Sequence, residues 1–326
     1  MENQWEDRTA SPGGAEGTGD IELWYREYRP YLFTIAYRML GTVSDAEDIV
    51  QDLFLSLSAA AAAPGGEPIR REKAYLARMA VNRCLNFLNS AAKRRETYVG
   101  PWLPEPLVDT ANPLPPDAAE RGEAVSYAFM VLLERLAPAE RAVFVLRETM
   151  GYEYAEIASL VGKSEANCRQ LFSRARRKLD AERSEETKPM AGRELVLVRR
   201  FVAAFRGGRA DELVRLLADD AVMFTDGGGK VRAAINPIYG PDRVEKLLSR
   251  IAFSRLHTSR LTEVPIAGGI GLAAWDEDRL TAFFCFEWSE GDEHGNRALR
   301  RIYNLFNPDK LAGVRLALPS PGPAQS

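Results

Sequence analysis

Residues 154–179 have the sequence YAEIASLVGKSEANCRQLFSRARRKL, and this stretch decides how the rest of the chain is interpreted. Its apolar spacing predicts two short helices separated by a turn at Gly162, and Ser164 is a suitable N-cap for the second helix. With the apolar stripe of the second helix against a core, these residues face outward: Arg169, Gln170, Ser173, Arg174, Arg176 and Arg177. Such a face suits the major groove of DNA, where side chains near the helix N-terminus reach bases and later cations reach phosphates. The stretch predicts a helix-turn-helix, although two solvated helices have the same pattern.

The composition is that of a soluble protein with more than one domain. Its 326 residues are 46% hydrophobic and 27% charged, with a net charge of −3, which predicts two or three domains with sizeable cores. No apolar run approaches the roughly 18 to 20 residues needed to cross a bilayer. Residues 1–20 lack the basic start and apolar centre of a secretion signal, so we expect a disordered tail and a cytoplasmic protein.

Cysteine and histidine usage argues against a metal or redox centre. Cys84, Cys168 and Cys285 lie far apart, each within an apolar pattern, which predicts reduced core residues. The two histidines have no close cysteine spacing, so we expect no metal and no cofactor. Residues 163–183 contain seven cations against three anions. Positive charge is therefore concentrated around the helix-turn-helix despite the acidic average.

Periodicity and proline content divide the chain into segments. We expect a helical domain at 21–96, a proline-rich linker at 97–122, a second helical domain at 123–184, an α+β domain at 192–311 and a tail at 312–326. The linker contains six prolines, yet it also carries Trp102, Leu103 and Leu107, which a solvated spacer does not need. We therefore expect the linker to dock on another part of the chain. A chance tryptophan in a spacer is the alternative.

The last domain combines helical and strand-like patterns. Strands are expected at 221–225, 231–235, 271–275, 280–288 and 299–306, after two helices and with a helix from 241 to about 253 between them. The sequence Asp226-Gly227-Gly228-Gly229 predicts a turn between the first two strands. Helices followed by a helix-interrupted antiparallel sheet predict a separate α+β domain.

The segment DAEDIVQDLF at 45–54 resembles the element with which extracytoplasmic-function sigma factors, members of the sigma-70 family, hold core RNA polymerase. Asp48, Gln51 and Asp52 share the helix face opposite the apolar residues, so an acidic face is available for a basic partner. The resemblance implies that these three residues contact the clamp helices of the polymerase β′ subunit, and that the chain also contacts the β flap. A solvated helix face is the alternative for this segment alone.

Two further segments resemble the promoter-reading elements of that family. The segment LARMAVNRCLNFL at 76–88 resembles the helix that melts and reads the −10 element by capturing a flipped base. The resemblance implies DNA contacts by the loop at 65–71, by Asn82, Asn86 and Phe87, and by Lys93, Arg94 and Arg95 near the backbone; Phe87 could instead be a core residue. The helix-turn-helix resembles the −35-reading domain. This implies base contacts by Arg169, Gln170 and Ser173, and phosphate contacts by Arg174, Arg176, Arg177 and Lys178.

The α+β domain resembles the SnoaL-like fold, a cone-shaped sheet of the nuclear-transport-factor-like superfamily that a subgroup of these sigma factors carries as a C-terminal extension. Three motifs associated with the subgroup occur in order: Trp102-Leu103-Pro104-Glu105-Pro106, Asp226-Gly227-Gly228-Gly229-Lys230 and Asn307-Pro308-Asp309-Lys310-Leu311. Membership implies a regulatory interdomain contact among these motifs, with the C-terminal domain in place of a separate anti-sigma factor. The expected fold is two all-α domains that bind DNA and polymerase, followed by an α+β SnoaL-like cone domain.

The resemblance implies a transcription initiation factor and not an enzyme, and alternatives for the last domain stay open. SnoaL-like folds also host cyclases and isomerases, so Asp226 or His257 could serve as an acid or base in a pocket with Tyr239 and Trp288. The domain could also bind a small effector without transforming it. An ordinary repressor with a ligand domain is less favoured, because it would not need the polymerase-like acidic helix.

Overall fold

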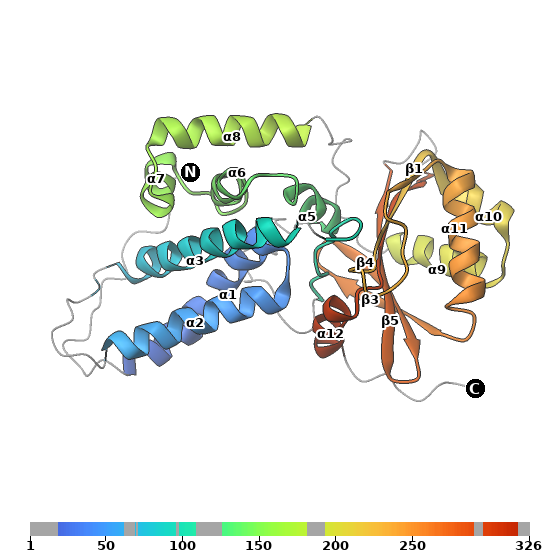
Figure 1. The fold of residues 1–326 in the computed structure, drawn as a ribbon, viewed down its shortest axis with the longest axis horizontal. Coiled ribbons are helices and arrows are strands. Elements are labelled where there is room, and N and C mark those ends of the chain that lie inside the picture. Colours follow the sequence, from blue (N-terminus) through green and yellow to red (C-terminus); the bar gives the residue numbers. More distant parts are fainter. Residues whose placement is uncertain are drawn as a thin grey trace.

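The computed structural model describes residues 19–61, 69, 71–95, 98–108, 126–180, 193–289 and 296–318. Residues 1–18 of the expected N-terminal tail, most of the loop at 65–71 and the second half of the linker lie outside these residues; Gly19 and Asp20 of that tail belong to the first helix. Figure 1 shows a helical part beside a second part in which a sheet lies between two groups of helices.

The first three helices are amphipathic and pack around a common core. They span Gly19–Leu40 (α1), Val43–Ala61 (α2) and Glu72–Arg95 (α3). Gly41 ends α1 with a φ of +76°, a left-handed conformation that glycine adopts without steric penalty. Leu32, Ile35 and Met39 of α1 are fully buried in the core that these helices enclose. The three helices expected at 21–96 are confirmed.

The second group of helices contains the helix-turn-helix. It comprises Tyr127–Leu133 (α5), Pro138–Phe144 (α6), a π-helical turn Val145–Thr149 (η1), Tyr154–Val161 (α7) and Glu165–Asp180 (α8). Gly162 ends α7 with a φ of +65°. Ser164 Oγ accepts a hydrogen bond from the Asn167 amide at 3.3 Å, as its N-cap position predicts. The two helices expected at 154–179 are confirmed.

Both helical groups bury their apolar faces in one hydrophobic core. α6 and α7 contact α3, and η1 contacts α1. Two fully buried arginines cross the junction: Arg38 donates to the Thr149 carbonyl at 2.9 Å, and Arg141 donates to the Arg38 carbonyl at 3.1 Å. Arg141 also pairs with Glu134 at 2.7 Å. The two groups form a single packed body in this structure.

The C-terminal part is a six-stranded sheet with helices on both faces. Its strands are Leu217–Asp226 (β1), Ile238–Tyr239 (β2), Arg260–Ile266 (β3), Gly269–Asp276 (β4), Arg279–Trp288 (β5) and Leu299–Leu305 (β6), in the spatial order β2-β1-β6-β5-β4-β3. Arg193–Arg206 (α9), Ala210–Leu216 (α10) and Pro241–Ser254 (α11) cover one face. Pro308–Ala317 (α12) and α5 lie on the other, toward the helical part (Figure 1). The expected α+β class is confirmed.

Four details of this domain differ from the expectation. The sheet is mixed, because β1 and β6 are parallel while the other neighbours are antiparallel. Residues 231–235 form no strand; Thr225 Oγ1 accepts from the Ala234 amide at 2.8 Å, so a side chain replaces the ladder bond. Two strands were not expected: the short β2, and β3, an edge strand that contains Pro265. The expected tail begins inside α12, which Asn307 caps.

Candidate nucleic-acid interface and interdomain contact

α8 presents its predicted DNA-binding residues to solvent. All six are exposed: Arg169, Gln170, Ser173, Arg174, Arg176 and Arg177. Arg169 forms an ion pair with Glu165 at 3.0 Å, and its Cζ lies 4.7 Å from the centre of the Tyr154 ring. Arg176 forms an ion pair with Asp180 at 3.7 Å. Exposed ion pairs of this kind are weak, so phosphate oxygens can displace them. The face is open to DNA, and its division into base and phosphate contacts stays a prediction.

α3 carries the predicted −10 residues on its outer face. Asn82 and Asn86 are exposed, whereas Phe87 is half-buried and packs against the helical core. Lys93, Arg94 and Arg95 form the last turn of α3, and their side chains lie outside the described part of the chain. The two asparagines are therefore accessible to a nucleotide.

α2 has an acidic, exposed face. Asp48, Gln51 and Asp52 are exposed, while Val50 and Leu53 on the opposite side are buried in the helical core. A cavity of about 140 Å³ lies beside this face, lined by residues of α1 and α2: Tyr25, Arg29, Phe33, Glu47, Val50 and Gln51. An acidic and partly hollowed face suits a basic helical partner.

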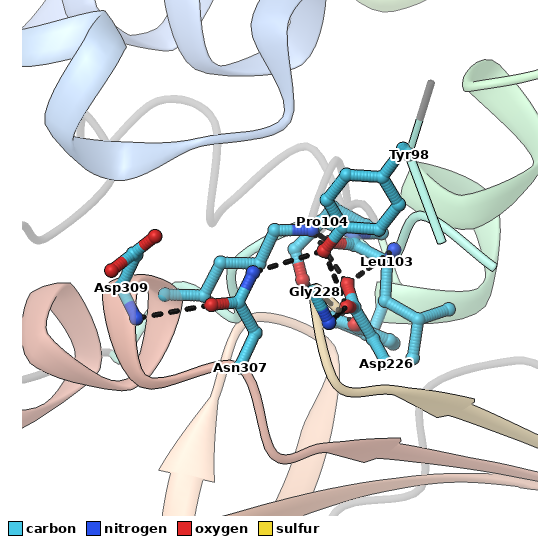
Figure 2. Close-up of polar contacts among 9 residues, drawn as sticks. Tyr98, Leu103, Pro104, Asp226, Gly228, Asn307 and Asp309 are labelled. Carbon is cyan, nitrogen blue, oxygen red and sulfur yellow. Dashed lines mark hydrogen bonds and ion pairs between the residues drawn. The ribbon is translucent and has the colours of Figure 1, made fainter. Parts of the chain in front are cut away.

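The extended segment 98–108 docks on the sheet, and Asp226 is the centre of that contact. Asp226 has no exposed surface. As Figure 2 shows in part, its carboxylate accepts from Tyr98 Oη at 2.5 Å, from the Leu103 amide at 3.0 Å and from Lys310 Nζ at 2.6 Å. Lys310 also donates to the Leu103 carbonyl at 2.5 Å. The Asp226 carboxylate therefore binds the backbone amide of Leu103, and the Lys310 ammonium binds the backbone carbonyl of the same residue.

Similarity to known proteins covers the same parts of the chain. The family model described as Sigma-70 region 2 matches residues 24–94, and the model described as Sigma-70, region 4 matches residues 126–179. The ECF RNA polymerase sigma factor SigJ of Mycobacterium tuberculosis (strain ATCC 25618 / H37Rv) is 37% identical over 227 residues, which are 69% of this chain and 70% of SigJ. The probable ECF RNA polymerase sigma factor SigI of the same strain is 36% identical over 306 residues, which are 91% of this chain and 97% of SigI. The chain belongs to the extracytoplasmic-function sigma factors.

The crystal structure of SigJ extends this likeness to the whole arrangement. It covers 90% of this chain and 98% of the SigJ chain, with a TM-score of 0.67 and 30% identity. This sigma factor therefore has region 2 and region 4 followed by the SnoaL-like extension of its subgroup. As a sigma factor it binds core RNA polymerase and promoter DNA to start transcription.

In this sigma factor, charged and aromatic side chains of all three subgroup motifs meet at the linker. Asn307 Nδ2 donates to Tyr98 Oη at 2.9 Å, and Lys310 Nζ lies 3.5 Å from the centre of the Trp102 ring. Burial lowers the pKa of Lys310, and the Asp226 carboxylate opposes this shift. Burial, together with the same carboxylate, raises the pKa of the Tyr98 phenol. A buried ion pair of this kind adds little stability itself, but it strongly penalises a state in which one partner is left alone.

Other residues of the motifs shape the contact. Gly228 has a φ of +62° and donates its amide to Asp226 Oδ1 at 3.0 Å. A Cβ at this position would lie 2.4 Å from Asn307 Nδ2, so the turn between Gly227 and Gly229 needs a glycine at its centre. At the rim, Lys230 and Asp309 form an exposed ion pair at 2.6 Å, and Pro308 occupies the first turn of α12. Pro104 and Pro106 are buried.

Glu105 connects the linker to the N-terminus of α2 and is only 3% exposed. Its Oε2 accepts from the amides of Val43 at 2.8 Å and Ser44 at 3.5 Å. Its own amide donates to the Gly41 carbonyl at 2.7 Å. Burial raises the pKa of Glu105 to about 7; the two amides and the charge of Lys310 oppose this shift.

Sequence reasoning missed several partners of the linker. Tyr37 of α1 donates to the Glu105 carbonyl at 2.7 Å, and Tyr127 of α5 donates to the Pro104 carbonyl at 2.8 Å. The linker therefore contacts region 2, the start of region 4 and the C-terminal domain together. Both tyrosines lie among apolar helix residues, and no feature of the sequence distinguishes them from ordinary core residues.

The residues considered for a catalytic pocket do not converge. The Asp226 carboxylate faces the linker, whereas Trp288 is buried on the opposite face of the sheet with α9, α10 and α11. His257 and Tyr239 are exposed. Among the described residues there is no group of three or more side chains that could hold a metal ion. None of the helices in that part of the chain has the length and apolar content to cross a membrane.

Proposed function

We propose that this sigma factor is regulated by its own C-terminal domain, which takes the place of a separate anti-sigma factor by holding the linker. In this proposal α8 reads the −35 element, α3 reads the −10 element, α2 contacts the β′ clamp helices, and a second contact is made with the β flap. The contact of the buried Asp226 carboxylate with Tyr98 and Leu103 of the linker carries the regulatory part.

The compact packing of region 2 against region 4 supports this role. α7 contacts α3, so both DNA-reading helices lie in one body. A body of about 150 residues has a radius of gyration of about 15 Å. The −35 and −10 elements are about 25 base pairs apart, or about 85 Å of B-DNA at 3.4 Å per pair. The compact body is too small to reach both elements, so initiation requires the two regions to separate.

Linker docking favours the compact state because segment 98–108 is bonded to region 2, to region 4 and to the C-terminal domain at the same time. Docking regulates polymerase only if the compact and separated states differ in their affinity for it. In this proposal only the separated state can make both polymerase contacts, which provides the difference in affinity. The apolar core shared by regions 2 and 4 favours the compact state, since the separated state loses it. The C-terminal domain adds its contacts with the linker to the compact state alone.

Reconstituted transcription tests the proposal with core polymerase and a promoter upstream of a candidate target. The proteins are the full chain, Asp226→Asn, and Asp219→Asn as a control at an exposed acid of the same domain that lies outside the three motifs. Asp226→Asn should raise core-dependent transcript several-fold at limiting sigma factor, and the control should match the unmodified chain. If small-angle scattering shows that Asp226→Asn opens the molecule while transcript stays constant, the regulatory proposal is wrong. If no variant initiates at any promoter or binds core polymerase, the assigned polymerase and promoter contacts fail as well.

A further inference from the structure

We propose that Glu105 is a helix cap that the linker supplies to α2, and that it positions the polymerase-binding face of this helix. The inference rests on the proposed contact of α2 with core polymerase. It gives a residue of the regulatory contact a second and opposite role, since Glu105 then supports polymerase binding while Asp226 restrains it.

The first amides of α2 find their acceptor far away in the sequence. Thr42, at the cap position, donates its hydroxyl to Asp45 Oδ2 at 2.5 Å. The amides of Val43 and Ser44 bond to Glu105 Oε2 instead. A carboxylate at this place satisfies free amides and complements the positive end of the helix dipole. The linker thus provides the capping group that a local Ser, Thr or Asp provides in most helices.

Region 2 itself anchors Glu105. The Glu105 amide donates to the Gly41 carbonyl, and its carbonyl accepts from Tyr37 Oη. The C-terminal domain approaches from the other side, where a Cβ on Gly313 would lie 3.1 Å from Glu105 Oε2. The four hydrogen bonds to region 2 do not involve the C-terminal domain, so they can persist after that domain releases the linker.

The capped turn leads directly into the acidic face. Asp48 follows Val43 by five residues, about 7.5 Å along the helix axis. Gln51 and Asp52 follow in the next turn. A frayed first turn would leave this face less ordered, and binding would then require extra ordering of the helix. Glu105 is therefore a positioning residue that acts on polymerase through α2.

The test uses the full chain in an Asp226→Asn background, where the C-terminal domain no longer restrains the linker. The readouts are hydrogen exchange of the amides at 43–45 and affinity for core polymerase. Adding Glu105→Ala should speed exchange of these amides at least tenfold and weaken polymerase binding about three- to tenfold, within the range of a lost cap. Glu105→Gln keeps an acceptor but loses the charge, so a smaller change of the same sign is expected. Asp219→Ala, which removes an exposed acid of β1 with no part in the linker contact, should change neither readout.

Unchanged exchange at 43–45 together with unchanged affinity in both Glu105 variants overturns the inference. Faster exchange spread equally over α2 and α3 also overturns it, because a cap acts locally. If Glu105→Ala does not fold, the two readouts on Glu105→Gln decide the question. Failure of the proposed regulation has a different signature: Asp226→Asn alone then equals the unmodified chain, while Glu105→Gln still weakens polymerase binding.

Discussion

Lys310 Nζ and Asp226 Oδ2 lie 2.6 Å apart, and their side chains are 4% and 0% exposed. Both charges belong to the C-terminal domain, yet each also bonds to the linker, through Leu103 for the ammonium and through Tyr98 and Leu103 for the carboxylate. The pair is fully hydrogen-bonded when the linker is docked. Release of the linker therefore removes three hydrogen bonds from these two charges, which links docking to the electrostatics of the domain.

Removing one charge of this pair should be far more damaging than removing a charge of the rim pair. Lys310→Met leaves the Asp226 carboxylate buried without a counter-ion, so we expect a loss of about 3–5 kcal/mol in the free energy of unfolding. Lys230→Met breaks an exposed pair of the same length, with side chains 56% and 64% exposed, and should cost at most about 1 kcal/mol. Urea unfolding followed by tryptophan fluorescence measures both. Equal small losses would contradict the buried-pair interpretation.

The stability contributed by Glu105 should fall as the pH rises from about 5 to 8. Its pKa is raised from 4.5 to about 7 in the folded chain, so the folded state binds more protons than the unfolded state between these values. By linkage, folding is then favoured at the lower pH, and the gain is lost as the pH rises through 7. The lowered pKa of Lys310 makes the free energy of unfolding rise with pH. Lys310 is present in both proteins compared, so the comparison isolates the contribution of Glu105. Thermal unfolding of Glu105→Gln and the unmodified chain at pH 5, 6, 7 and 8 should show the variant gaining relative stability; a constant difference would refute the assignment.

Alanine should be tolerated worse at Gly41 than at Gly162, although both glycines have a positive φ. A Cβ at Gly41 would lie 2.4 Å from Glu134 Oε1 and 3.3 Å from Pro104 Cβ, whereas no atom of the described residues lies within 4 Å of one at Gly162. Gly162→Ala should therefore lose about 1–2 kcal/mol from the left-handed backbone alone. Gly41→Ala should lose more, because region 2, region 4 and the linker meet there. Melting temperatures of the two variants decide this, and an equal loss would argue against the close approach.

Arginines of α8 should determine the salt dependence of promoter binding. Arg174→Ala and Arg177→Ala should each reduce the slope of log K against log salt by about 0.9 if each contacts one phosphate. Gln170→Ala should instead change discrimination at one base pair, by about 1–3 kcal/mol. Arg200→Ala changes an exposed arginine of α9 and should leave both properties unchanged. Binding titrations at several salt concentrations provide the slopes, and unaltered slopes in both Arg174→Ala and Arg177→Ala would rule out the phosphate assignment.

Replacement of a buried polar residue should stabilise the C-terminal domain. Asn304 of β6 is fully buried, and neither its Oδ1 nor its Nδ2 has a hydrogen-bond partner among the described residues. Asn304→Leu removes this unsatisfied amide at similar size, so we expect a gain of about 1 kcal/mol or more. Asn307→Leu is the contrasting control and should destabilise, because Asn307 caps α12 and bonds to Tyr98. A destabilised Asn304→Leu in calorimetry would show that the amide is satisfied in solution.

The sequence predicted what depends on local spacing and left open what depends on distant partners. The apolar stripe of α8 is buried as its periodicity requires, at Cys168, Leu171, Ala175 and Leu179. The same periodicity could not predict that this stripe joins the core of region 2. Arg38 and Arg141 show the reason: arginine is rarely buried, and each is accommodated by a carbonyl more than 100 residues away.

The predicted site shows the same division. Trp102, Asp226 and Lys310 were expected to meet because each belongs to one of the three short motifs of the subgroup. The structure brings these residues together. Tyr37 and Tyr127 were missed, since their role depends on hydroxyl groups that meet the linker only in three dimensions. Residues 231–235 were misassigned because the side chain of Thr225 supplies the pairing that a strand would.

The parallel pairing of β1 with β6 sets the time at which the linker-binding surface is completed during synthesis. The backbone carbonyl of Asp226 accepts from the amides of Phe306 and Asn307, so the linker-binding surface forms only after β6 has been made. At about 5–20 residues per second, the ribosome adds Lys310 about 7 to 26 s after Asp180, where α8 ends. During this interval the nascent chain carries both promoter-reading regions without the complete domain that we propose restrains them. Under the proposed regulation, each newly made molecule passes once through a period in which it binds polymerase most readily, and the speed of translation sets the length of that period.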